Sequence, residues 1–133
     1  LKKQALDSNL DKQIIFSGSK SHDEVLKILK SSGIGLALYS GEFGTNLFGD
    51  SMKIREYLAC GLPIITTNVT ETSLVVKDFR AGEVIGLNKK EFIEAVTKIF
   101  SNKYLEYKQN ALKAAAEFDF DKMISVPLKK LGV

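Results

Sequence analysis

The sequence predicts an α/β domain built as a three-layer α/β/α open parallel sheet. Short apolar runs alternate with longer amphipathic stretches along the chain. The runs are continuously apolar rather than alternating, which indicates strands covered on both faces. The repeated order of strand, helix and strand implies parallel pairing through right-handed crossovers. Of the 133 residues, 44% are apolar and 26% are charged, so we expect one globular domain over residues 1–133.

The first elements follow from these runs in chain order. The expected strands are the apolar runs 14–16, 34–39, 62–65 and 84–85. A helix is predicted over residues 21–32, whose apolar side chains share one face, and Gly33 can end it. A second helix is predicted over residues 51–60, and it closes at Gly61.

The two ends of the chain are predicted to be helical. A strongly periodic segment follows Asn88, with Glu91 placed three residues on as its capping partner. Residues 105–116 continue as another helix that is rich in good helix formers. Residues 1–10 have the pattern of a helix end, where a doubly wound domain would begin with a strand. We therefore expect an N-terminally truncated fragment that lacks its first strand–helix unit.

Composition and charge exclude several classes of site. Cys60 is a single cysteine, which excludes an internal disulfide and a cysteine-rich zinc site and suits a reducing, cytoplasmic compartment. His22 is a single histidine, so a histidine-dependent triad or multi-histidine metal site has no second member, and we expect His22 to help start a helix. The 19 basic and 16 acidic residues are interleaved, which argues against a nucleic acid partner. No stretch approaches the ~20 apolar residues of a membrane span.

The loop over residues 40–51 is the first candidate for a binding site. In open parallel sheets the binding crevice lies at the carboxyl ends of the strands, and this loop follows the second expected strand. It contains three glycines and leads into a helix N-terminus, where backbone amides and the helix dipole favour anions. Glycine-rich loops are equally often flexible connectors, so loop composition alone leaves both readings open.

The helix after this loop carries a more specific pattern. Residues 56–65 read EYLACGLPII, a short helix that stops at a glycine and re-enters a buried strand past a proline. We expect the small and apolar side chains of this helix to face the sheet, namely Ile54, Leu58 and Ala59. This leaves Lys53 and Glu56 near the entrance of the crevice.

This run resembles the C-terminal, nucleotide-sugar-binding domain of glycosyltransferase family four, enzymes of the GT-B fold with two facing Rossmann-like domains. The family helix has the form E-(A/Y)-(M/L)-A-(C/A)-G-x-P-(V/I)-(V/I). Residues 14–18, 33–40 and 75–85 are similar to further strands and turns of that domain, so the resemblance covers nearly the whole chain. Residues 118–131 would correspond to the family's C-terminal helix, which crosses back to the other domain.

The resemblance assigns roles to individual residues. Glu56 falls on the glutamate that accepts hydrogen bonds from the ribose hydroxyls of the donor. Gly18 and Ser19 follow the strand whose loop lines the base. Residues that the resemblance places at the donor phosphates and sugar are Glu42, Gly44, Gly49, Asp50, Ser51, Met52 and Lys53. No catalytic residue is assignable in this fragment.

The activity that the resemblance implies is transfer of a sugar from a nucleoside diphosphate sugar, with retention and without a metal. The enzyme would be a hexosyltransferase of polysaccharide biosynthesis that needs no cofactor. Its partners would be the donor, a glycan or lipid-linked acceptor, and an N-terminal domain absent here. Because many relatives act on lipid-linked acceptors, association with the inner face of the membrane is a further expectation. The fragment alone is expected to be inactive.

The sequence departs from the family at the second glutamate, which addresses the donor sugar. Phe48 occupies that position, and Glu42 resembles the family's E-x-F-G loop but lies several residues too early. Either the loop carries an insertion or the sugar is held differently, and both alternatives stay open.

Other readings of the same residues remain. Glu56 also fits a solvated helix residue paired with Lys53, and Lys53 fits a surface lysine. The missing second glutamate also fits a non-catalytic α/β binding or scaffold module. A sugar-nucleotide epimerase of the same fold is the third alternative.

Overall fold

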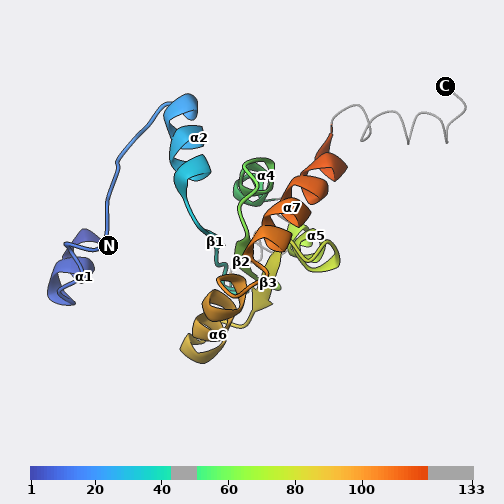
Figure 1. Cartoon of the computed structure of the whole chain (residues 1–133). Coiled ribbons are helices and arrows are strands. Elements are labelled where there is room, and N and C mark those ends of the chain that lie inside the picture. The colour runs from blue at the N-terminus through green and yellow to red at the C-terminus, as the bar shows by residue number, and fades with distance from the viewer. Residues whose placement is uncertain (43–50, 120–133) are drawn as a thin grey trace, which may run out of the picture.

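Three parallel strands form the centre of the computed structural model, which describes residues 1–42 and 51–119. The strands are β1 (Gly35–Ala37), β2 (Ile64–Thr67) and β3 (Gly82–Ile85), and they lie in the order β1-β2-β3. Both pairings are parallel. The predicted α/β class with a parallel sheet is therefore confirmed (Figure 1).

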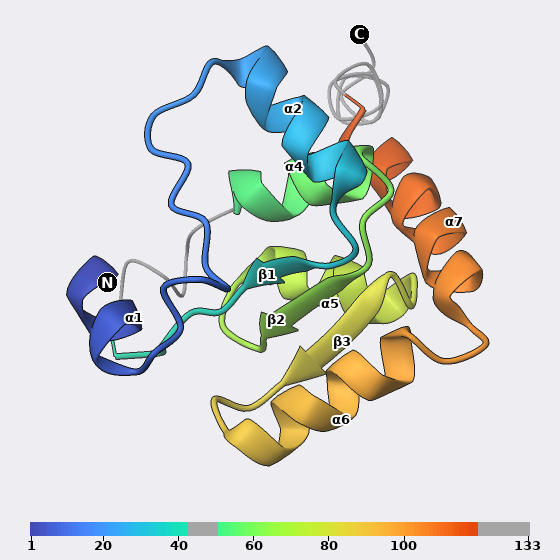
Figure 2. The same ribbon diagram turned by 60° about the vertical axis from the view of Figure 1, so that its left-hand side comes forward.

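Helices cover the two faces of this sheet. Helices α4 (Met52–Ala59) and α5 (Glu71–Asp78) lie on one face, and α7 (Tyr104–Ala115) packs against both. Helix α6 (Lys89–Ile99) covers β2 and β3 from the other face (Figure 2). The remaining elements precede or follow this unit and are α1 (Lys2–Asp7), α2 (His22–Ser31) and the short 3₁₀ helix η1 (Ala116–Phe118).

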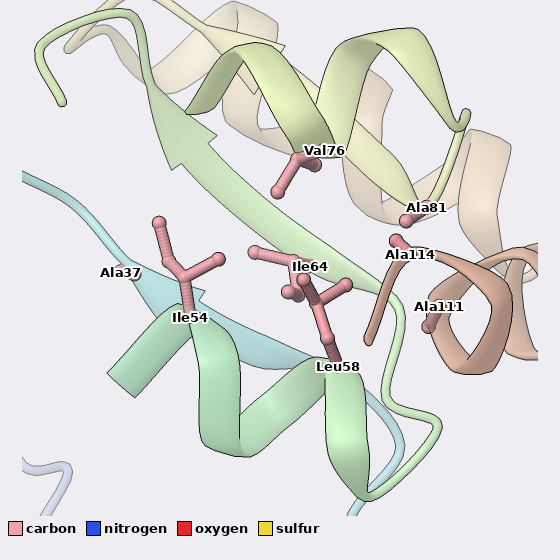
Figure 3. Close-up of a cluster of buried hydrophobic side chains, with 8 residues drawn as sticks. All are labelled: Ala37, Ile54, Leu58, Ile64, Val76, Ala81, Ala111 and Ala114. Carbon is pink, nitrogen blue, oxygen red and sulfur yellow. The ribbon is translucent and has the colours of Figure 1, made fainter. Parts of the chain in front are cut away.

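Neighbouring residues of β2 belong to two separate cores. Ile64 packs among side chains from β1, α4, α5 and α7, and Figure 3 shows this cluster. Ile65 points to the opposite face and packs with Ala95 and Ile99 of α6. All four residues of β2 are buried, so the prediction that continuous apolarity means cover on both faces is confirmed for this strand.

The same prediction is wrong for β1 among the described residues. Leu36 is the register partner of Ile65 and therefore faces the α6 side of the sheet. It is nevertheless 47% exposed, because α6 lies under β2 and β3. Covering a strand on both faces needs a helix on each, and the sequence of a strand does not show where the neighbouring helix lies.

The expected strand at residues 14–16 is also wrong. This segment forms no strand, and Ile15 is 91% exposed. A strand is stable only when a neighbour satisfies its backbone hydrogen bonds. Among the described residues, no strand pairs with residues 14–16. Apolar composition alone therefore does not make this segment a strand.

The helix boundaries follow their capping residues. Ser21 accepts a hydrogen bond from the Glu24 amide and the Glu24 carboxylate accepts one from Ser21, a complete capping box. Asn88 caps α6 through the amide of Glu91, as predicted. Helix α5 begins after Thr70 and was not predicted from periodicity. The expected helix over residues 118–131 lies almost wholly outside the described residues.

None of the helices described here combines the length and apolar character needed to cross a membrane.

Candidate functional site

The start of α4 is fixed by Ser51. Its hydroxyl accepts a hydrogen bond from the Ile54 amide at 3.4 Å and lies 2.6 Å from the hydroxyl of Tyr39, just past β1. Its own amide donates to Thr72 Oγ1 at 3.3 Å. Ser51 is only 7% exposed, so a buried N-cap ties α4 to the end of β1 and to the start of α5.

The end of α4 is fixed by Gly61, as the sequence predicts. Gly61 has φ +65°, the left-handed conformation that glycine adopts without penalty. The Leu62 amide then donates back to the Tyr57 carbonyl at 2.9 Å. The Pro63 carbonyl accepts from the Gly35 amide at 2.9 Å, so the chain enters β2 directly beside β1. Both ends of α4 are thereby fixed against the sheet.

Hydroxyl side chains join the carboxyl ends of β1 and β2. Thr67 Oγ1 accepts from the Tyr39 amide at 3.0 Å and donates to the Tyr39 carbonyl at 2.8 Å. Thr66 Oγ1 donates to the Ala37 carbonyl at 2.8 Å. Sequence reasoning missed this group, although residues 66–73 read TTNVTETS and so concentrate hydroxyls after an apolar run. These bonds hold the rim of the sheet in one geometry.

Lys53 and Glu56 lie on the accessible part of α4. Residues three apart on a helix are neighbours on its surface. The Lys53 ammonium lies 6.0 Å from the centre of the Tyr39 ring, which places it over the end of β1. The Glu56 side chain is 34% exposed, and its Oε1 lies 3.9 Å from His22 Nδ1. A cation and a carboxylate therefore share the edge of α4 that faces the sheet rim and the start of α2.

The start of α2 brings the predicted base-lining segment to this edge. His22 is the first residue of α2, as predicted, and sequence analysis did not foresee its position beside Glu56. Gly18 and Ser19 lie a few residues earlier and are exposed, and Gly18 has φ +67°. Figure 2 shows α2 and α4 side by side on the same side of the sheet. Through His22 the structure connects the 18–22 segment to Glu56.

The remaining residues predicted to contact the donor lie in the turn after β1, at the start of α4 or outside the described residues. Glu42 is exposed in the turn after β1, and Met52 is 65% exposed at the start of α4. Gly44, Gly49 and Asp50 lie outside the described residues, as does Phe48. Their roles stay predictions.

The packing of α4 corrects one expectation. Ile54 and Leu58 face the sheet and are fully buried, as predicted, but Ala59 is exposed. Ala59 is one residue after Leu58, a step of about 100° around the helix, which turns it off the buried face. Cys60, the next residue, is partly covered.

Tyr57 is an ionisable residue of α4 that lies next to Glu56 in sequence. Burial raises the pKa of the Tyr57 hydroxyl, and the neighbouring Tyr39 and Glu56 add to this shift, so Tyr57 stays neutral. Within the described ranges no three histidine, cysteine, aspartate or glutamate side chains gather as a metal site would require. The arrangement offers an anionic acceptor, a cation and a helix N-terminus along one rim.

Removing the Ser51 hydroxyl tests how α4 is anchored. We expect Ser51→Ala to lower the free energy of unfolding by about 1 kcal/mol, because the cap on Ile54 is lost and Tyr39 loses a partner. Urea denaturation measures this change, with Ser8→Ala at the exposed end of α1 as the matched control. Equal midpoints for the two variants would contradict the anchoring role.

A family model described as glycosyl transferases group 1 matches residues 1–118. No curated protein and no solved structure gives a match.

Proposed function

The chain belongs to the glycosyl transferases group 1 family, and from this premise we propose that it binds the nucleoside diphosphate sugar donor along the rim of α4. The observation that carries the proposal is the convergence of Glu56, Lys53 and the start of α2 at the carboxyl end of the parallel sheet. Ligands of open α/β sheets bind at that end.

Glu56 is proposed to hold the donor ribose. An ionised carboxylate can accept hydrogen bonds from two vicinal hydroxyls at once, and such charge-assisted bonds contribute about 1.5–3 kcal/mol. With its side chain 34% exposed, Glu56 can be reached by a ligand while the buried Ile54 and Leu58 fix its helix. His22 Nδ1 lies 3.9 Å from this carboxylate, and the base is proposed to extend past His22 toward Gly18 and Ser19.

The donor phosphates are proposed to lie at the N-terminus of α4, beside Lys53. The first amides of a helix have no partner within it, and the helix dipole favours an anion there. The Ser51 hydroxyl already accepts from Ile54, which leaves the Met52 and Lys53 amides for a phosphate. Ser51 would then act through the position of α4, since its amide and hydroxyl both have protein partners.

This arrangement suits departure of a nucleoside diphosphate. Negative charge accumulates on the leaving phosphate as the anomeric carbon becomes cation-like. Donors aimed at that phosphate therefore stabilise the transition state more than the bound ground state. Because Lys53 and the helix dipole supply positive charge, we propose transfer without a metal, with retention, to a glycan or lipid-linked acceptor held by a second domain.

Nucleotide titration of the isotopically labelled chain tests the proposal. Adding uridine, guanosine or adenosine diphosphate is expected to shift the amide signals of Met52, Lys53 and Glu56 together with those of residues 18–22. The matching nucleosides without phosphates should shift the Met52 and Lys53 signals much less. Shifts confined to other parts of the chain, or none with any nucleotide, would reject the proposed site.

Replacing Lys53 by methionine isolates the phosphate contribution. We expect the affinity for the preferred nucleoside diphosphate to fall about threefold to tenfold, a modest loss because Lys53 is solvent-exposed. Calorimetry should also show a weaker salt dependence, while affinity for the nucleoside stays the same. Lys90→Met on the exposed face of α6 is the matched control. Unchanged diphosphate affinity in Lys53→Met would contradict the phosphate role.

A further inference from the structure

The outer edge of β3 carries backbone groups that face away from β2. Ile64 pairs with Gly82 in register, and the Ile64 amide donates to the Ala81 carbonyl. The backbone groups of successive residues in a strand point to alternate edges. Because the Ala81 carbonyl faces β2, the groups of Glu83 face β2 as well, and the amide and carbonyl of Val84 point to the opposite edge. No strand of the described chain lies on that side (Figure 2). An edge of this kind is a template for a further strand.

A cavity of about 690 Å³ runs along this edge, and none of its lining residues belongs to α4. Its floor is β3 itself, from Gly82 to Gly86, and its walls come from α5, α6 and the start of α7. Val84 and Ile85 are half-buried, so the floor offers apolar side chains as well as backbone groups. The volume falls in the range of about 300–1,000 Å³ that is typical of binding sites.

The walls of this cavity are predominantly basic. Four cations line it, Lys77, Arg80, Lys98 and Lys103, against the two carboxylates of Glu83 and Glu106. Glu83 is already satisfied, since it accepts hydrogen bonds from Lys98 and from the Tyr107 hydroxyl. Burial and this bond raise the pKa of Tyr107, which keeps the hydroxyl a donor. Within residues 1–42 and 51–119, no ion pair forms at Lys77, Arg80 or Lys103.

The same charges argue against a second copy of this chain as the occupant. Pairing two β3 edges would bring the basic walls of both copies together, and facing like charges destabilise a sheet. An extended acidic segment meets no such repulsion. It finds backbone partners at Val84 and cations on both sides of the strand.

We propose that the β3 edge, from Gly82 to Gly86, binds an extended acidic segment of another protein as an added parallel or antiparallel strand. Backbone hydrogen bonds to Val84 supply the alignment, and Lys77, Arg80 and Lys103 select aspartate and glutamate side chains. The inference does not depend on the proposed donor site, which lies on a different part of the sheet.

Titrating the labelled chain with a short peptide of alternating glutamate and valine tests the backbone pairing. We expect saturable shifts of the Val84 amide and its neighbours. A peptide with the same side chains but N-methylated alternate amides should bind about tenfold more weakly, because it cannot complete the ladder. Equal affinity of the two peptides, or shifts that map elsewhere, would overturn the proposal.

Two variants distinguish strand addition at the β3 edge from nonspecific charge attraction. Val84→Pro removes an amide that points away from β2, so we expect a folded sheet with peptide binding lost. Lys77→Glu combined with Lys103→Glu should weaken binding about tenfold, while Lys27→Glu with Lys30→Glu on α2 changes net charge equally and should not. An equal loss in the α2 pair, or equally tight binding of inorganic polyphosphate at the same amides, would contradict strand addition. Self-association through β3, seen by sedimentation and abolished by Val84→Pro, would assign the edge to a second copy instead.

Discussion

Replacing Glu56 by glutamine is expected to lower kcat/KM for the donor about tenfold to a hundredfold when transfer is assayed in the complete gene product. The expectation follows from the proposed ribose contact, because a neutral amide cannot accept charge-assisted hydrogen bonds from both hydroxyls. Losing 1.5–3 kcal/mol of stabilisation corresponds to about that change in rate. Because Glu56 lies on a partly exposed face of α4, the melting temperature should stay nearly unchanged.

A 2′-deoxy nucleotide donor provides the sharper comparison for Glu56. The protein with Glu56 should prefer the ribose donor over the 2′-deoxy donor. Glu56→Gln should lose most of that preference, because the carboxylate that distinguishes the two donors by binding the hydroxyl is gone. Glu94→Gln on the exposed surface of α6 is the control and should keep both the rate and the preference. If Glu56→Gln keeps the ribose preference, Glu56 is a surface residue and its proposed role is wrong.

Local sequence signals predicted the elements that are built from neighbouring residues. Asn88 with Glu91 three residues on predicts a capped helix start, and this pair is observed. Gly61 predicts the end of α4 because left-handed conformations suit glycine. These signals involve residues only a few positions apart in the chain, so the sequence alone is sufficient to predict them.

Non-local features could not be read in the same way. Leu36 belongs to a continuous apolar run, yet its exposure depends on where α6 lies, and that helix is far away in sequence. The contact of His22 with Glu56 joins residues from two helices separated by β1. The Thr67 bonds to Tyr39 depend on strand register in the same manner. Each of these features follows from tertiary packing rather than from local pattern.

The resemblance to a family located the candidate site more closely than composition did. The loop over residues 40–51 suggested an anion site through its glycines, but residues 43–50 lie outside the described structure. The pattern from Glu56 to Ile65 instead specified a helix, a glycine cap and a strand, all of which are observed. Their geometry is observed, while the donor contacts of Glu56 and Lys53 stay predictions.

The sheet itself depends on a close approach at Gly82. A Cβ added there would lie 1.9 Å from the Ile64 carbonyl oxygen and 2.7 Å from the Ile64 amide nitrogen. Both are backbone atoms of β2, so no side-chain rotation relieves the clash. The two strands would have to separate or shift, which disturbs the fully buried Ile64 and the α4 packing around it.

Gly82→Ala is therefore expected to lower the free energy of unfolding by about 3 kcal/mol, at the upper end of the cost of inserting one methyl group into a packed interior. Urea denaturation should show a lower midpoint with an unchanged slope, since the surface exposed on unfolding stays the same. Gly41→Ala is the matched control, because a Cβ there meets nothing within 4 Å and its effect should stay within about 0.5 kcal/mol. Equal midpoints for the two alanine variants would show that β3 does not approach β2 as closely as Gly82 allows. Such a result would also undermine the alternation that turns the Val84 amide toward the open edge.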